Sequence, residues 1–122
     1  MTRINTGISP HLLTNKHLIA EHREIKRIPN NVAKGKCNLN NIPSEFTLGK
    51  GHVCFFYDKL LYLKNRYEQL YQECINRGFN VQYYGDAWNG IPVQLMNDYI
   101  ATEKDVEIIQ QRIYEKLNKN LK

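Results

Sequence analysis

The residues with the types and spacing best suited to chemistry lie between His17 and Arg27, in the segment HLIAEHREIKR. In an α-helix, which turns about 100° per residue, one face of this segment carries an imidazole and two carboxylates, from His17, Glu21 and Glu24. The neighbouring face is basic and carries Lys16, Arg23 and Arg27. Carboxylates beside a basic stripe suit acid–base chemistry on an anionic substrate. A solvated helix of mixed charge has the same pattern, and from this segment alone that interpretation is favoured.

The start of the chain offers a second reactive group. Met1 precedes the small residue Thr2, so we expect methionine aminopeptidase to remove Met1 and expose a threonine α-amine. An unperturbed α-amine has a pKa of roughly 7.7–8.0, so about a tenth of it is neutral and nucleophilic at pH 7. The competing interpretation is an ordinary frayed terminus without a role.

Composition restricts the class of protein and its partners. The 122 residues predict one domain covering residues 1–122, and 42% hydrophobic and 24% charged residues are ordinary for a soluble globular protein. A net charge of +5 favours polyanionic partners, with nucleic acid first and an acidic membrane surface second. No apolar run reaches the roughly 20 residues that a membrane-spanning helix needs, and the start of the chain lacks the apolar segment of a signal peptide.

The cysteines and histidines do not form a metal-binding pattern. The cysteines are odd in number and lack C-x-x-C spacing: Cys37, Cys54 and Cys74. This predicts reduced thiols in a cytosol-like compartment, with the cysteines acting as small buried hydrophobic residues, and it argues against structural zinc. A metal hydrolase built on His17, Glu21, His22 and Glu24 is disfavoured, because His22 lies about 140° around the helix from His17.

Three main helices are predicted, joined by long irregular loops. The first runs from Pro10 to Arg27 with Ser9 as its N-cap, and Pro29 breaks or kinks it. In the central helix, apolar residues recur at spacings of four and three from Phe56 to Cys74. Residues 77–79, Arg-Gly-Phe, end this helix, because glycine adopts a positive φ easily.

The last helix is predicted to begin at a capping box, Thr102-Glu103-Lys104-Asp105, with Asp105 in place of the usual glutamate. Its inward side chains are Val106, Ile109, Ile113 and Leu117. No segment has the signature of a β-strand. The predicted fold is therefore all-α, a compact single domain of three main helices with long irregular loops.

Several segments resemble one known family. In chain order these are MTRIN, HLIAEHRE, GHVCFFYDKL, RGFN and the tripeptide at 98–100, DYI. They are similar to the phage pyrimidine-dimer DNA glycosylases of the endonuclease V type, over nearly the whole chain, and the GHV-x-FFYDKL block is specific. The resemblance implies a compact, mainly helical domain that uses no metal or other cofactor. It also implies excision of UV-induced cyclobutane pyrimidine dimers, followed by cleavage of the backbone at the abasic site.

The resemblance also implies roles for individual residues. The nucleophile would be the α-amine of Thr2, which forms an imine with the damaged sugar, and the essential carboxylate would be Glu24, paired with His17 in an H-x6-E pattern. The residues expected to contact DNA are Arg3, His17, Arg23, Arg27, Arg112 and Lys116. The expected partner is double-stranded DNA carrying pyrimidine dimers or abasic sites, bound by a monomeric, cytoplasmic enzyme of a type that viruses encode and that acts in the host cell.

The chain departs from the family at two places. The family's aromatic W-Y-K-Y-Y cluster near the C-terminus has no counterpart in residues 115–122, which affects dimer recognition more than backbone cleavage. Residues 9–14 alter the spacing between Thr2 and the first helix. The aromatic residues Tyr83, Tyr84 and Trp88 either contact DNA or pack in the core, and packing is favoured. His52 is interpreted as a hydrogen-bonding residue that orders its loop.

The alternative to an enzyme is a non-catalytic basic DNA-binding module. In that case the basic stripes hold phosphates and Glu24 is an ordinary helix-surface residue. Salt-dependent binding without cleavage of dimer-containing or abasic DNA would distinguish this module from the enzyme.

Overall fold

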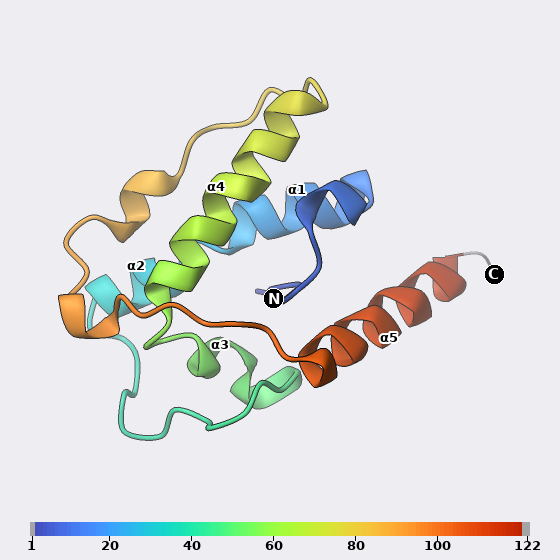
Figure 1. Cartoon of the computed structure of the whole chain (residues 1–122). Coiled ribbons are helices and arrows are strands. Elements are labelled where there is room, and N and C mark those ends of the chain that lie inside the picture. The colour runs from blue at the N-terminus through green and yellow to red at the C-terminus, as the bar shows by residue number, and fades with distance from the viewer. Residues whose placement is uncertain (1, 121–122) are drawn as a thin grey trace.

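The computed structural model describes residues 2–120, with their side chains through residue 117. The described helices are α1 (Asn15–Glu24), α2 (Arg27–Ala33), α3 (His52–Phe55), α4 (Leu60–Asn76) and α5 (Glu103–Asn120). Short 3-10 turns join them: η1 (Pro10–Leu12), η2 (Gly49–Gly51), η3 (Gly85–Trp88) and η4 (Val93–Leu95). Figure 1 shows these helices connected by long loops, and the described residues contain no β-strand. The all-α prediction is confirmed.

The predicted first helix is divided into three elements. The segment at Ser9-Pro10 forms only the 3-10 turn η1, and α1 begins after Thr14, whose Oγ1 accepts the backbone N–H of His17 at 3.2 Å. An unpaired N–H at the start of a helix needs such an acceptor, and Thr14 meets this need two residues after η1 ends. The predicted start at Pro10 is therefore wrong by five residues for the α-helical part.

The predicted break at Pro29 is also wrong. Helix α1 ends at Glu24, and α2 begins at Arg27 with Pro29 inside its first turn. Proline fits there because the first N–H groups of a helix have no partner within the helix to lose. Helices α1 and α2 are therefore separate elements, and Arg27 is not on the same helix as Arg23.

Helix α4 is the central helix, and α1 packs against it. It begins at Leu60, so the predicted start at Phe56 is wrong, and the short helix α3 precedes it. Its end is as predicted: Gly78 has φ +80°, and the N–H of Phe79 donates to the carbonyl of Cys74 at 2.9 Å. The buried face of α4 comprises Leu60, Leu63, Arg66, Tyr67, Leu70 and Cys74.

Aromatic side chains fill much of the core around α4. Trp88 is buried, with its ring centroid 5.3 Å from that of Tyr67, so this residue packs as favoured from the sequence. Tyr84 is half-buried and its N–H donates to the Tyr67 hydroxyl at 2.6 Å, whereas Tyr83 is exposed. Among the cysteines only Cys74 is fully buried; Cys37 and Cys54 are half-buried free thiols.

Helix α5 begins with the predicted capping box. The N–H of Thr102 donates to the Asp105 carboxylate at 3.1 Å, and the N–H of Asp105 donates to Thr102 Oγ1 at 3.1 Å. Ile109 is fully buried, but Leu117 is 40% exposed, so the prediction that Leu117 faces inward is wrong. In Figure 1 the C-terminal part of α5 extends to one side of the other helices. Within the described residues, no helix combines the length and apolar character needed to cross a membrane.

Candidate functional site

The N-terminal arm, defined here as residues 2–9, enters the protein interior instead of fraying. Ile4, Asn5, Thr6 and Ile8 are all buried. A turn closes through the N–H of Ile8, which donates to the carbonyl of Asn5 at 3.1 Å. Within this turn Gly7 has φ +81°, and a Cβ atom at this position would lie 2.5 Å from Cγ2 of Val106 on α5. Glycine is required because the arm turns sharply against a helix.

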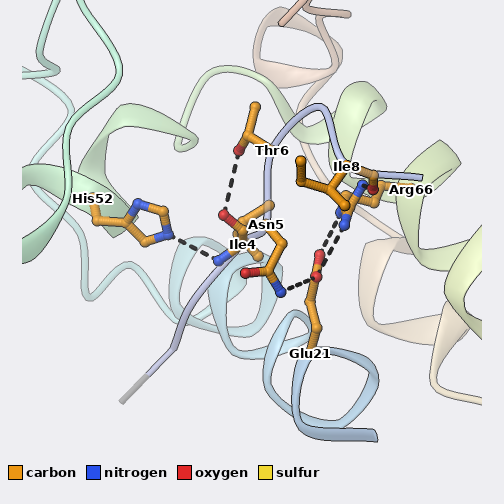
Figure 2. Close-up of polar contacts among 7 residues, drawn as sticks. All are labelled: Ile4, Asn5, Thr6, Ile8, Glu21, His52 and Arg66. Carbon is orange, nitrogen blue, oxygen red and sulfur yellow. Dashed lines mark hydrogen bonds and ion pairs between the residues drawn. The ribbon is translucent and has the colours of Figure 1, made fainter. Parts of the chain in front are cut away.

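A histidine holds the first buried residue of the arm. The N–H of Ile4 donates to Nε2 of His52 at 2.9 Å (Figure 2). Nδ1 of His52 lies 2.9 Å from the carbonyl oxygen of Thr47. Because a carbonyl only accepts hydrogen bonds, we assign the imidazole proton to Nδ1. Burial lowers the pKa of His52 to about 4, so its ring is neutral at pH 7. The predicted hydrogen-bonding role of His52 is confirmed.

A buried ion pair holds the other side of the arm. Arg66 and Glu21 form a two-pronged pair in which Nη2 of Arg66 donates to Oε1 of Glu21 at 3.0 Å and Nε donates to Oε2. Glu21 also accepts from Nδ2 of Asn5 at 2.7 Å, and Nη1 of Arg66 donates to the carbonyl of Ile8 at 2.9 Å. The side chains of Arg66 and Glu21 are only 5% and 1% exposed. Glu21 is therefore a structural carboxylate bound within the protein.

The sequence contained a signal for Arg66 that the prediction missed. Arg66 lies three residues after Leu63 and four before Leu70, within the apolar stripe of the central helix. A charged residue at a core position needs a buried partner of opposite charge, because an isolated buried charge is costly. Its partner could not be identified from the sequence, since Glu21 is 45 residues away.

A cavity of about 380 Å³ lies between the arm, α1 and α5. The described residues that line it are Arg3, Asn5, Lys16, His17, Ala20, Glu21, Glu24, Arg112 and Lys116. Five of the predicted site residues thus come together here, namely Arg3, His17, Glu24, Arg112 and Lys116. The prediction did not assign a site role to Lys16 or Asn5, although Lys16 belongs to the basic face that the sequence indicated.

The charges in this cavity are arranged around Glu24. Burial and the nearby Arg112 lower the pKa of Arg3, and the Glu24 carboxylate partly offsets this effect. Burial likewise lowers the pKa of Arg112, again against the influence of Glu24. Both guanidiniums remain charged at neutral pH, because the pKa of arginine is normally above 12. Since Glu21 is bound to Arg66, Glu24 is the carboxylate of the described lining that is available to balance these cations.

His17 contributes a neutral ring to the same cavity. Burial is the largest cause of its lowered pKa, followed by the positive charges of Arg112, Lys116 and Lys16. Its Nδ1 lies 2.7 Å from the hydroxyl of Thr14, the N-cap of α1. This contact holds the ring at the start of the helix. Because its pKa is lowered, the ring is uncharged at pH 7. A phosphate bound among the same cations would offset their effect and favour protonation of His17.

Two residues of the arm, Thr2 and Asn5, lie at or near the cavity. Thr2 is half-buried and directly precedes Arg3, although the described lining of the cavity does not include Thr2 itself. Asn5 lines the cavity, and its Oδ1 atom is buried without a hydrogen-bond partner among the described residues. Asn5 therefore has an unused acceptor close to the start of the chain.

The remaining predicted residues lie outside the cavity. Arg23 has a side chain that is 57% exposed, and its Nη2 lies 3.4 Å from Oε2 of Glu24. Arg27 is exposed at the start of α2. His22 is buried on another side of α1, where its Nε2 lies 3.0 Å from the Tyr67 hydroxyl. Among the described residues no group of three or more His, Cys, Asp or Glu side chains is placed to hold a metal ion.

A family model described as pyrimidine dimer DNA glycosylase matches residues 1–84. The matched part contains the N-terminal arm, α1 and α4, and thus Arg3, Glu24 and the buried Glu21–Arg66 pair. Arg112 and Lys116 lie outside it, on α5.

Proposed function

The chain belongs to the pyrimidine dimer DNA glycosylase family, and from this we propose a double-stranded DNA repair enzyme that both excises the damaged base and cuts the backbone. In this proposal the enzyme acts as a glycosylase and abasic-site lyase, through an imine formed by the α-amine of Thr2. The observation that carries it is the shared cavity of Arg3, the neighbour of Thr2, and Glu24. Removal of Met1 is part of the proposal, because only then is the α-amine of Thr2 free.

Nearby cations would make this amine a better nucleophile. Arg3 is its chain neighbour, and Arg112 lines the cavity that Arg3 also lines. At an effective dielectric constant of about 20, one cation roughly 5–8 Å away disfavours protonation by roughly 2–3 kcal/mol as an upper guide. This corresponds to a pKa lowered by about one to two units. A larger fraction of the amine would then be neutral at pH 7.

The glycosylase step forms one bond as another breaks. The neutral nitrogen attacks C1′ of the damaged nucleotide, the bond from C1′ to the base breaks, and the base leaves with the electron pair and takes up a proton. The attached nitrogen then loses a proton, and its lone pair forms the C1′=N bond as the C1′–O4′ bond breaks, the sugar ring opens and O4′ takes up a proton. At an abasic site the amine condenses with the C1′ aldehyde and releases water, so both substrates reach the same iminium.

The lyase step follows because the iminium withdraws electrons from C2′. Loss of a C2′ proton forms the C2′=C3′ bond and expels the phosphate from C3′, which cuts the strand on the 3′ side. Glu24 would accept this proton and stabilise the cationic intermediates. Water then hydrolyses the imine and frees the amine for another cycle.

Basic residues around the cavity would bind the DNA backbone. Lys16, Arg112 and Lys116 line the cavity. Arg23 and Arg27 are exposed and lie close in sequence to Glu24, so they would contact phosphates farther along the duplex. Such contacts position the DNA without reading its sequence. A damaged duplex is easier to bend and open, so part of the preference for dimers would come from the lower cost of deformation.

The test uses two defined duplexes, one with a single thymine dimer and one with an abasic site, each with and without borohydride. The wild-type enzyme should cut both and form a covalent protein–DNA adduct when borohydride reduces the imine. Glu24→Gln should cut at least 100-fold more slowly while binding DNA normally, because an amide cannot accept the proton. Glu107→Gln, the same change at an exposed position of α5, serves as the control.

Each contrary outcome has a distinct meaning. Full cleavage by Glu24→Gln would remove the carboxylate from the mechanism. Salt-dependent binding by the wild-type protein without cleavage of either duplex would instead support the non-catalytic DNA-binding module.

A further inference from the structure

We propose that His52 is a positioning residue, which fixes the N-terminal arm through the backbone of Ile4 so that the residue-2 amine meets its substrate in one orientation. This inference rests on the proposed nucleophile at Thr2. A nucleophile on the first residue of a chain is not part of a helix or strand that would fix its position. Its position must therefore come from contacts made by the residues that follow.

The backbone N–H of Ile4, two residues after Thr2, makes a buried hydrogen bond. Ile4 is 0% exposed, and its N–H donates to Nε2 of His52, a residue 48 positions away in the chain. Two residues of chain span at most roughly 7 Å. An arm held at Ile4 therefore keeps the residue-2 amine within that distance of a fixed point in the protein interior.

His52 is itself held rigidly. Nδ1 bonds to the carbonyl of Thr47, and the ring packs edge-to-face against Phe46 and Phe56 at centroid distances of 5.4 and 5.5 Å. His52 is 1% exposed and is not among the described residues that line the cavity. His52 therefore acts on the arm and not on the substrate.

The arm is held from its other side as well. Asn5 donates to Glu21, and the carbonyl of Ile8 accepts from Arg66. Figure 2 shows His52 and Glu21 on opposite sides of the arm. The Glu21–Arg66 pair fixes residues 5 and 8, on both sides of the turn at Gly7, whereas His52 holds the backbone of residue 4. If His52 were lost, the pair would still hold the turn, but the N–H of Ile4 would lose the acceptor that fixes its backbone.

The experiment compares two substitutions that separate the two hydrogen bonds of the ring. In His52→Asn, the shorter amide takes the place of Nδ1 and keeps the bond to Thr47 but offers no acceptor to Ile4. In His52→Gln, the longer side chain takes the place of Nε2, and its oxygen accepts the Ile4 N–H. Both variants remove the imidazole, so they form a matched pair.

The readouts are single-turnover borohydride trapping on an abasic duplex, the Kd for that duplex and hydrogen exchange of the Ile4 amide. His52→Asn should trap DNA ten-fold to 100-fold more slowly, since small misplacement of a reacting group has effects of this size, with a Kd within two-fold of wild type. His52→Gln should trap within three-fold of the wild-type rate. The Ile4 amide should exchange faster in His52→Asn only, while the amide of Leu70 in α4 stays protected. A merely structural role would not separate the trapping rate from Kd in this way.

Several outcomes would overturn the inference. If the wild-type protein forms an adduct and folded His52→Asn traps equally fast, the inference fails and the proposed function stands. If the wild-type protein forms no adduct, the proposed function fails, and this inference fails with it. Should His52→Asn be unfolded at the assay temperature, His52→Leu replaces it, because leucine fills the space between the phenylalanine rings without offering an acceptor; the same slow trapping is expected.

Discussion

Substitution of Glu21 by leucine tests how much the buried ion pair contributes to the fold. The change removes the carboxylate and leaves the Arg66 guanidinium unpaired at a site where its side chain is 5% exposed. Removing one partner of a buried pair typically costs about 3–5 kcal/mol. Three hydrogen bonds to Glu21 are also lost, two from Arg66 and one from Asn5. Charged hydrogen bonds contribute about 1.5–3 kcal/mol each and are not additive, which is consistent with the same range.

A loss of this size is a large part of the total stability of a small domain, which is about 5–15 kcal/mol. With about 3–6 °C of Tm per kcal/mol for a chain of this length, Glu21→Leu should melt roughly 10–25 °C below wild type. The double variant Glu21→Leu/Arg66→Met should regain at least half of the loss, because an apolar pair of similar volume avoids the unpaired charge. It does not regain everything, since Asn5 and the carbonyl of Ile8 lose their partners.

The assay is a double-mutant cycle from urea unfolding monitored by circular dichroism, with Arg66→Met as the second single variant. Lys64→Met/Glu68→Leu, which removes a more exposed i,i+4 pair on the same helix, is the control and should change stability by about 1 kcal/mol or less. A loss below 1 kcal/mol for Glu21→Leu, or strictly additive losses in the double variant, would refute the reasoning.

Three further predictions concern pH, backbone geometry and DNA binding. The pKa of His52 is about 4 in the folded protein and about 6.5 in the unfolded chain, so between these pH values only the unfolded chain takes up a proton as the pH falls. The free energy of unfolding, measured with urea, should therefore fall by about 3 kcal/mol by pH 4. It should fall by less in His52→Gln, which lacks the imidazole. Gly7→Ala should lose about 1–3 kcal/mol in the same assay, because of its positive φ and the close contact with Val106. Lys116→Ala should weaken binding to all duplexes about equally and reduce the slope of log K against log salt concentration by about one unit. Fluorescence anisotropy over a salt series measures this slope. An unchanged slope would show that Lys116 does not contact the DNA backbone.

Local signals explain what could be predicted about the fold. The end of α4 at Gly78 and the capping box of Thr102 and Asp105 each depend on residues within a few positions of each other. The sequence therefore contains all the information needed for them. The errors at Pro10 and Pro29 have the same local origin, because proline is equally compatible with a 3-10 turn, a helix start and a helix break.

The site was predictable in part from helical spacing and in part from the family resemblance. Spacing placed His17 and Glu24 on one face of α1, whereas the resemblance supplied Arg112 and Lys116, which share a face of α5. That these faces meet across the arm depends on tertiary packing, to which the local pattern gives no guide. Arg27 was misplaced because the chain leaves α1 at Glu24.

Buried contacts between distant residues were the part that could not be foreseen. The bonds from His52 to Ile4 and from Arg66 to Glu21 join residues 48 and 45 positions apart. The position of Arg66 within an apolar stripe indicated that it is buried, but no local pattern identified its partner. A single sequence offers no covariation to link them.

Peptide mapping of the borohydride-reduced adduct identifies the attacking nitrogen directly. After trapping on an abasic duplex, nuclease treatment and proteolysis, mass spectrometry should find the sugar remnant on the peptide that begins with Thr2, attached to its α-amine. An adduct on the side chain of Lys16 or Lys116, both of which line the same cavity, would contradict the assignment of the nucleophile to the N-terminus.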